Sequence, residues 1–86
     1  MYRLFLVEDD RGIAEAITAQ TALWDMETVC AKDFRRVMAE FTECAPQLVL
    51  LDISLPFYDG YHWCREIRSV SSVPVIFISS AADNLN

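Results

Sequence analysis

The stretch LVLLDISLP, from Leu48 to Pro56, places four consecutive aliphatic residues directly before an acidic side chain. Such an uninterrupted apolar run suits a strand that is buried on both faces, as in a parallel sheet covered by helices. A carboxylate at the end of that strand lies close to the protein interior, where an uncompensated charge costs several kcal/mol. The sequence therefore predicts a cation or a positively charged side chain near Asp52.

Two further apolar runs end in polar residues in the same way. Leu4–Val7 is followed by three acidic residues, and Val75–Ile78 is followed by two serines. Glu27–Ala31 is a weaker candidate for a fourth strand. The polar residues that follow the two further runs are Glu8, Asp9, Asp10, Ser79 and Ser80.

Amphipathic patterns between these runs favour helices. Apolar stripes at helical spacing extend from Ile13 to Trp24 and from Phe34 to Phe41, and a third helix is predicted from Gly60 to Arg68. Asp10 and Asp33 stand where N-caps are expected. Strands that alternate with helices in this way indicate a doubly wound α/β fold with a parallel sheet.

Composition limits the remaining choices. With 86 residues, 53% of them hydrophobic, the chain can form one core and no more than one domain. A net charge of -6 argues against direct binding to nucleic acid or to anionic membranes, and two glycines are too few for a glycine-rich phosphate loop. Three cysteines without C-x-x-C spacing and no apolar run of about 18 residues favour a reduced, cytoplasmic setting without a membrane span.

The acidic residues are expected to converge. In an open parallel sheet the functional crevice lies beyond the carboxyl ends of the strands, which is where Glu8, Asp9 and Asp52 are placed. Clustered carboxylates repel one another, which raises at least one pKa or recruits a divalent cation. Because all the ligands are oxygen atoms, Mg²⁺ is expected first, with Mn²⁺ as the alternative. Asp10 is assigned to the helix cap.

These motifs together resemble the receiver domain of bacterial two-component response regulators. The resemblance implies a flavodoxin-like strand order 2-1-3-4-5, with residues 1–86 as the N-terminal part that lacks the last helix, strand and helix. Some residues of the chain are also similar to those of the winged-helix, DNA-binding subfamily of transcriptional regulators. The motifs that carry the resemblance are Leu4–Asp10, Asp52-x-x-x-Pro56-x-x-Asp59-Gly60, and Pro74–Ser79 with its terminal hydroxyl.

The resemblance also implies a role for each matching residue. Asp52 would accept a phosphoryl group from the histidine of a sensor histidine kinase, which makes the chain a self-catalysing phosphoacceptor and no enzyme in the ordinary sense. Asp9 would bind Mg²⁺ directly, Glu8 through a water molecule, and Ser54 through its backbone carbonyl. Ser79 would be the switch hydroxyl, and its neighbour Ser80 stays open as an alternative. DNA would be bound only by an output domain outside this chain.

One departure from the family keeps other functions open. Family members carry a lysine after a fifth strand, whereas Lys32 is the only lysine here and is expected at the far edge of the sheet. A receiver-like interaction module without phosphotransfer therefore remains an alternative, as does a Mg²⁺-dependent phosphoesterase or nuclease. An exposed fourth strand would favour a homodimer or a strand-swapped assembly.

Overall fold

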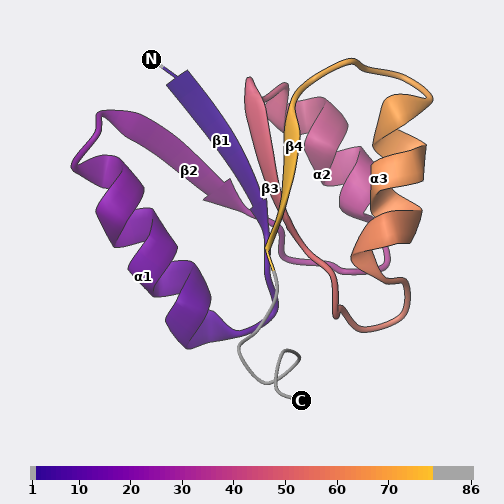
Figure 1. The fold of residues 1–86 in the computed structure, drawn as a ribbon, viewed down its shortest axis with the longest axis horizontal. Helices are drawn as coiled ribbons and strands as arrows, with labels where there is room; N and C mark the ends of the chain where they lie inside the picture. Colours follow the sequence, from indigo (N-terminus) through magenta and orange to yellow (C-terminus); the bar gives the residue numbers. More distant parts are fainter. Residues whose placement is uncertain (1, 79–86) are drawn as a thin grey trace.

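The computed structural model describes residues 2–78 and contains one parallel sheet with the strand order β2-β1-β3-β4 (Figure 1). This confirms the doubly wound α/β prediction and the order 2-1-3-4. The predicted Ser79 and Ser80 lie outside the described residues. The elements in chain order are β1 (Tyr2–Val7), α1 (Arg11–Ala22), β2 (Met26–Cys30), α2 (Val37–Cys44), β3 (Leu48–Asp52), α3 (Gly60–Arg68) and β4 (Val75–Ile78).

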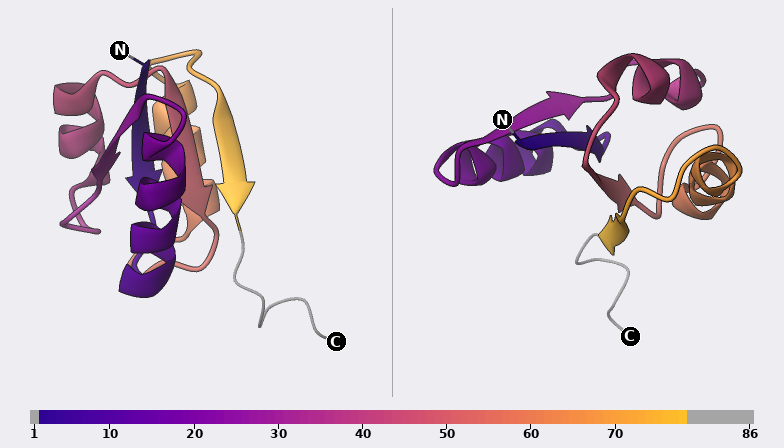
Figure 2. Two further views of the ribbon diagram at one scale, coloured as in Figure 1. Left: turned by 90° about the vertical axis from the view of Figure 1, so that its left-hand side faces the viewer. Right: turned by 90° about the horizontal axis from the view of Figure 1, so that it is seen from above.

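Different helices pack on the two faces of the sheet. Helix α1 lies on one face, against β2, and α2 and α3 lie on the other (Figure 2). The larger core fills the space between the sheet and the α2–α3 pair, because alternate strand residues point to that face. Its buried residues are Phe5, Val7, Ala31, Val37, Phe41, Cys44, Val49, Leu51, Trp63 and Ile67.

Helix α1 is shorter than its apolar stripe indicates. Asp10 is its N-cap, as predicted, and its carboxylate accepts the N–H of Ile13 at 3.0 Å. The prediction that Trp24 belongs to the inward stripe is wrong, since the helix ends at Ala22 and the Trp24 side chain is 63% exposed. The chain leaves the helical path at Asp25, whose φ of 60° is left-handed, before it enters β2.

Helix α2 begins later than predicted, and Asp33 is not its N-cap. The Asp33 carboxylate accepts the N–H of Arg35 at 3.0 Å and so stabilises a turn before the helix. The carboxylate of Glu40 reaches back from the helix and accepts the N–H groups of Lys32 at 2.9 Å and Asp33 at 2.8 Å. A side chain inside the helix therefore anchors the preceding loop, and Val37 becomes the first helical residue.

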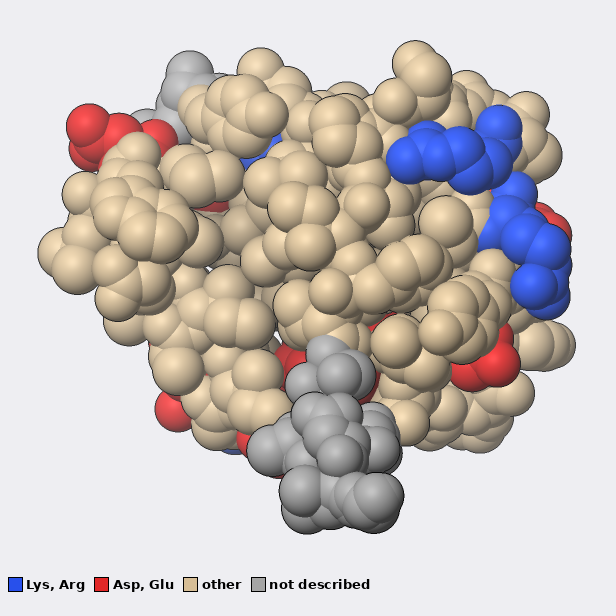
Figure 3. All heavy atoms as spheres, viewed as in Figure 1, with Lys and Arg blue, Asp and Glu red and all other residues tan. Residues whose placement is uncertain are grey.

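Strand β4 lies at one edge of the described sheet and exposes apolar side chains. Ile76 is 51% exposed and Phe77 is 38% exposed, and they point to opposite faces because they are adjacent in a strand. In the space-filling view, uncharged atoms dominate this side of the molecule, while Lys and Arg atoms gather over α3 (Figure 3). Within residues 2–78, no helix combines the length and the apolar character needed to cross a bilayer.

Gly60 fixes the way in which the chain leaves β3 and enters α3. Its N–H donates to the carbonyl of Ile53 at 2.9 Å, which closes the intervening loop. A Cβ atom at position 60 would lie 2.3 Å from the carbonyl oxygen of Asp52. Only a residue without a side chain permits this close approach of helix and strand.

We predict that Gly60→Ala destabilises the protein by about 2 kcal/mol or more, since backbone atoms would have to move apart. Gly12→Ala is the matched control, because a Cβ there meets only the Asp10 carboxylate at 3.3 Å. The control should change the stability by less than about 1 kcal/mol. Urea unfolding of both variants measures the difference, and equal stabilities would contradict the prediction.

Candidate functional site

The pairing of β1 with β3 brings the acidic residues together. In this parallel register Val7 is the partner of Leu51, so the next residues along each strand are Glu8 and Asp52. One carboxylate oxygen from each of Glu8, Asp9 and Asp52 lies within 4.8 Å of the other two. The predicted convergence is therefore confirmed, and we call these three residues the acidic cluster.

The acidic cluster is mostly buried. Glu8 is 8% exposed and Asp52 is 3% exposed, whereas Asp9 is exposed to solvent. The N–H of Asp10 donates to Glu8 at 3.1 Å, and the N–H of Ser54 donates to Asp52 at 3.3 Å. Among residues 2–78, no Lys or Arg forms an ion pair with any of the three carboxylates. The two backbone N–H groups therefore supply positive dipoles at the cluster where no ion pair does.

Burial and mutual repulsion shift the ionisation of the cluster. Burial raises the pKa of Glu8 to about 7, the N–H of Asp10 opposes this shift, and the charges of Asp52 and Asp9 add to it. Burial also raises the pKa of Asp52, against the hydrogen bonds from Ser54 and Glu8. Both pKa values are shifted in the same direction, so the folded, metal-free cluster binds protons more readily than isolated carboxyl groups do.

The donor set of the acidic cluster fits a hard divalent cation. All three side chains offer oxygen atoms, and no His or Cys belongs to the group. Mg²⁺ and Mn²⁺ prefer such ligands, while Zn²⁺ prefers nitrogen and sulfur. A bound cation would also supply the positive charge that no described Lys or Arg provides.

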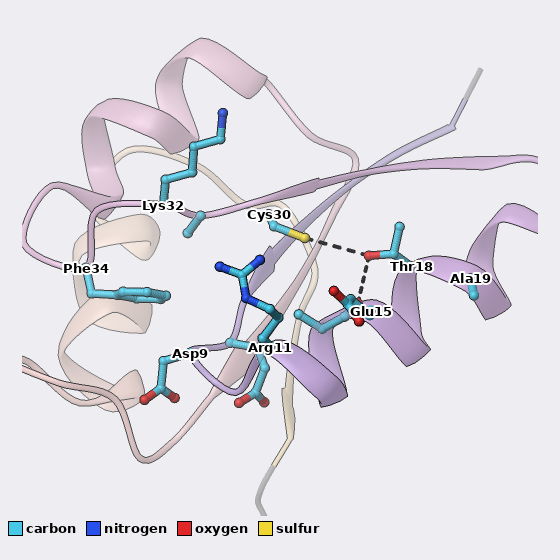
Figure 4. Close-up of a pocket in the computed structure, with 11 residues that line it drawn as sticks. Asp9, Arg11, Glu15, Thr18, Ala19, Cys30, Lys32 and Phe34 are labelled. Carbon is cyan, nitrogen blue, oxygen red and sulfur yellow. Dashed lines mark hydrogen bonds between the residues drawn. The ribbon is translucent and has the colours of Figure 1, made fainter.

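Ser54 and Lys32 are both exposed side chains outside the acidic cluster. Ser54 follows Asp52 by two residues and is exposed, and its N–H already contacts the Asp52 carboxylate. Lys32 is exposed, as predicted, and its ammonium group points away from Asp9 (Figure 4). It therefore does not replace the lysine that the resemblance calls for.

A pocket that the sequence pattern did not predict lies beside the acidic cluster. This pocket of about 780 Å³ lies between α1 and the loop that follows β2, and Glu8 and Asp9 form one end of it. Arg11 projects into it in Figure 4, opposite a Thr18 hydroxyl that lies 3.6 Å from the Cys30 sulfur.

Comparison with known proteins gives consistent matches. The family profile described as the response regulator receiver domain matches residues 4–86. The Bacillus subtilis protein described as the uncharacterized transcriptional regulatory protein YvcP is 48% identical over 86 residues, which are 100% of this chain and 36% of YvcP. The chain thus spans about a third of the length of the curated relatives it matches.

Solved structures share the fold. The N-terminal domain of the nisin resistance regulator NsrR has a TM-score of 0.87 and 31% identity, over 100% of this chain and 73% of that chain. The response regulator TrrA of Thermotoga maritima, crystallised in complex with the histidine kinase ThkA, has a TM-score of 0.84 and 25% identity, over 93% of this chain and 70% of that chain.

We predict that the metal-free protein loses stability as the pH rises from about 5 to about 7. The pKa of Glu8 is about 7 in the folded state against 4.5 in an unfolded chain, so the folded state binds more protons across this interval. The raised pKa of Asp52 acts in the same direction. Thermal unfolding in the presence of a chelator, followed across this pH range, measures the slope.

Glu8→Gln is the control for this prediction, because the amide keeps the shape of the side chain and has no charge to lose. The variant should show a flatter dependence of the melting temperature on pH than the parent protein. A melting temperature of the parent that rises steadily between pH 5 and 7 would contradict the assignment.

Proposed function

The chain belongs to the response regulator receiver domain family, and on this basis we propose that it accepts a phosphoryl group on Asp52 from a sensor histidine kinase. The observation that carries the proposal is the burial of Asp52 at the end of β3, with oxygen atoms of Glu8 and Asp9 within 4.8 Å. A carboxylate in that setting is positioned as a nucleophile beside ligands for a divalent cation.

The reaction requires Asp52 in its anionic form. A carboxylate oxygen of Asp52 attacks the phosphorus atom, the bond from phosphorus to the donor histidine nitrogen breaks, and the electron pair stays on that nitrogen. The product is an aspartyl phosphate. Mg²⁺, when bound, supplies the positive charge that offsets the negative charge spread over the phosphoryl oxygens in the transition state.

We assign the metal ligands from the cluster and the loop after it. Asp9, the exposed member, binds the cation directly, and Asp52 is a second ligand. Glu8, which has an oxygen atom within 4.8 Å of Asp9 and Asp52, acts through a water molecule. The backbone carbonyl of Ser54 completes the protein ligands, and Ser79 is the switch hydroxyl that follows β4.

The wider role follows from the relatives. The curated relatives are about three times as long as this chain, and YvcP is described as a transcriptional regulatory protein. We infer that this receiver domain controls an output domain that binds DNA, and that the protein works in the cytoplasm. The TrrA complex with the histidine kinase ThkA supports a kinase as the phosphoryl donor. Phosphotransfer to and from Asp52 is then the only reaction that the domain catalyses.

We predict that acetyl phosphate and Mg²⁺ add one phosphoryl group to the protein, and that Asp52→Asn abolishes this labelling. The asparagine amide cannot attack phosphorus, so labelling is lost. The substitution also removes one negative charge from a buried acidic cluster, so it should not lower the melting temperature. Intact-mass spectrometry measures the addition. Labelling that persists in a folded Asp52→Asn variant would contradict the assignment of the phosphoacceptor.

We predict that Asp9→Asn weakens Mg²⁺ binding by about tenfold or more, because it removes a charged oxygen ligand. Asp10→Asn is the matched control: the neighbouring residue loses the same charge, but asparagine still caps α1. Titration with Mg²⁺, followed by tryptophan fluorescence, gives both affinities. Equal weakening in the two variants would show that only the local charge matters.

A further inference from the structure

The loop between β3 and α3 contains a strained turn close to the acidic cluster. The N–H of Tyr58 donates to the carbonyl of Pro56 at 2.8 Å across Phe57, whose φ is 71°. These features define a classic γ-turn, which is rare and strained for a residue with a side chain. Phe57 lies three residues after Ser54, so a change in this turn would shift the backbone beside Asp52.

A contact from a second loop holds the strained residue. The guanidinium carbon of Arg35, in the loop before α2, lies 4.9 Å from the centroid of the Phe57 ring. In the part of the chain that the structure describes, no hydrogen bond and no ion pair joins these two loops, so this cation–π contact is the polar link between them. Arg35 is itself oriented by Asp33, whose carboxylate accepts its N–H at 3.0 Å and lies 3.8 Å from its Nε.

The exposure of this pair argues against a role in the hydrophobic core. Phe57 is 66% exposed, and the side chain of Arg35 is 67% exposed. Neither residue belongs to the core cluster, so the contact contributes little to the packing of the domain. Its main structural effect is local: it links the loop before α2 to the turn that follows the proposed phosphoacceptor.

We propose that Arg35 and Phe57 are positioning residues that hold the β3–α3 loop in the conformation in which the acidic cluster and Ser54 bind a divalent cation. The inference rests on the proposed function, since it concerns the same metal site. Arg35 holds the Phe57 ring in place, and the position of the ring stabilises the γ-turn at Phe57. Neither residue is expected to touch the cation.

The sign of the effect separates this role from simple electrostatics. A positively charged side chain near three carboxylates repels a second cation, so removal of that charge should tighten the binding of Mg²⁺. Loss of a positioning contact should weaken the binding instead. The adjacent Arg36 is exposed, carries the same charge and has no hydrogen-bond or ion-pair partner for its side chain among the described residues. It therefore provides a matched control.

The first experiment compares the Mg²⁺ affinity of Arg35→Ala and Arg36→Ala in the intact protein, by titration followed by tryptophan fluorescence. We expect Arg35→Ala to bind about two- to fivefold more weakly than the Arg36→Ala control, the effect expected from an exposed cation–π contact. Both variants should melt at the temperature of the parent protein. Equal or tighter binding by Arg35→Ala would overturn the proposal.

The second experiment tests the route through the γ-turn. Phe57→Ala removes the ring but keeps a side chain in the strained conformation, whereas Phe57→Gly removes the ring and the strain together. We expect Phe57→Ala to bind Mg²⁺ more weakly than Phe57→Gly, and Arg35→Ala to have no further effect in the Phe57→Gly background. A loss of affinity on Arg35→Ala that persists in that background would overturn the proposal.

The proposed metal site and the positioning role of Arg35 and Phe57 can fail separately. If the parent protein binds Mg²⁺ and Asp9→Asn weakens this binding, the metal site stands, and the behaviour of Arg35 and Phe57 alone decides the inference. If the parent protein shows no binding of Mg²⁺ that depends on Asp9, both the metal site and the inference are overturned.

Discussion

The parallel pairing of β1 with β3 is the constraint on which the rest of this structure depends. Its register places Val7 beside Leu51 and so forces two carboxylates, Glu8 and Asp52, to follow next to each other at a buried edge. A slip of one residue would turn the apolar side chains of both strands to the wrong faces and would separate the two acids. Packing of the hydrophobic core therefore keeps the carboxylates of Glu8 and Asp52 close together, although the repulsion between them is unfavourable.

Sequence reasoning succeeded where one physical effect dominates. Continuous apolar runs located β3 and β4, and the amphipathic pattern from Gly60 to Arg68 located α3, because burial decides those segments. The convergence of the acidic cluster followed from strand topology alone. Sequence reasoning failed where local hydrogen bonds compete with periodicity. Trp24 matched the helical stripe, yet the left-handed Asp25 ends the helix before it.

Two features of the site had no signal in the sequence, for a related reason. Phe57 has a positive φ, a conformation that glycine or asparagine adopts much more often. A phenylalanine at this position therefore did not indicate the turn. The sequence pattern predicted Asp33 as the N-cap of α2. Instead, the carboxylate of Glu40, inside the helix, accepts backbone N–H groups of the preceding loop. Both outcomes depend on contacts between segments, which spacing along the chain does not record.

Protons and divalent cations must compete for the acidic cluster. As the proposed phosphoacceptor, Asp52 has to be anionic to attack phosphorus, and its burial opposes the anion. Burial raises the pKa values of Glu8 and Asp52 alike, so the metal-free cluster binds protons more readily than isolated carboxyl groups do. A cation at this cluster would favour the anionic carboxylates and so release protons. Binding of a metal would therefore depend on pH, because protons and the cation both relieve the repulsion between the three carboxylates.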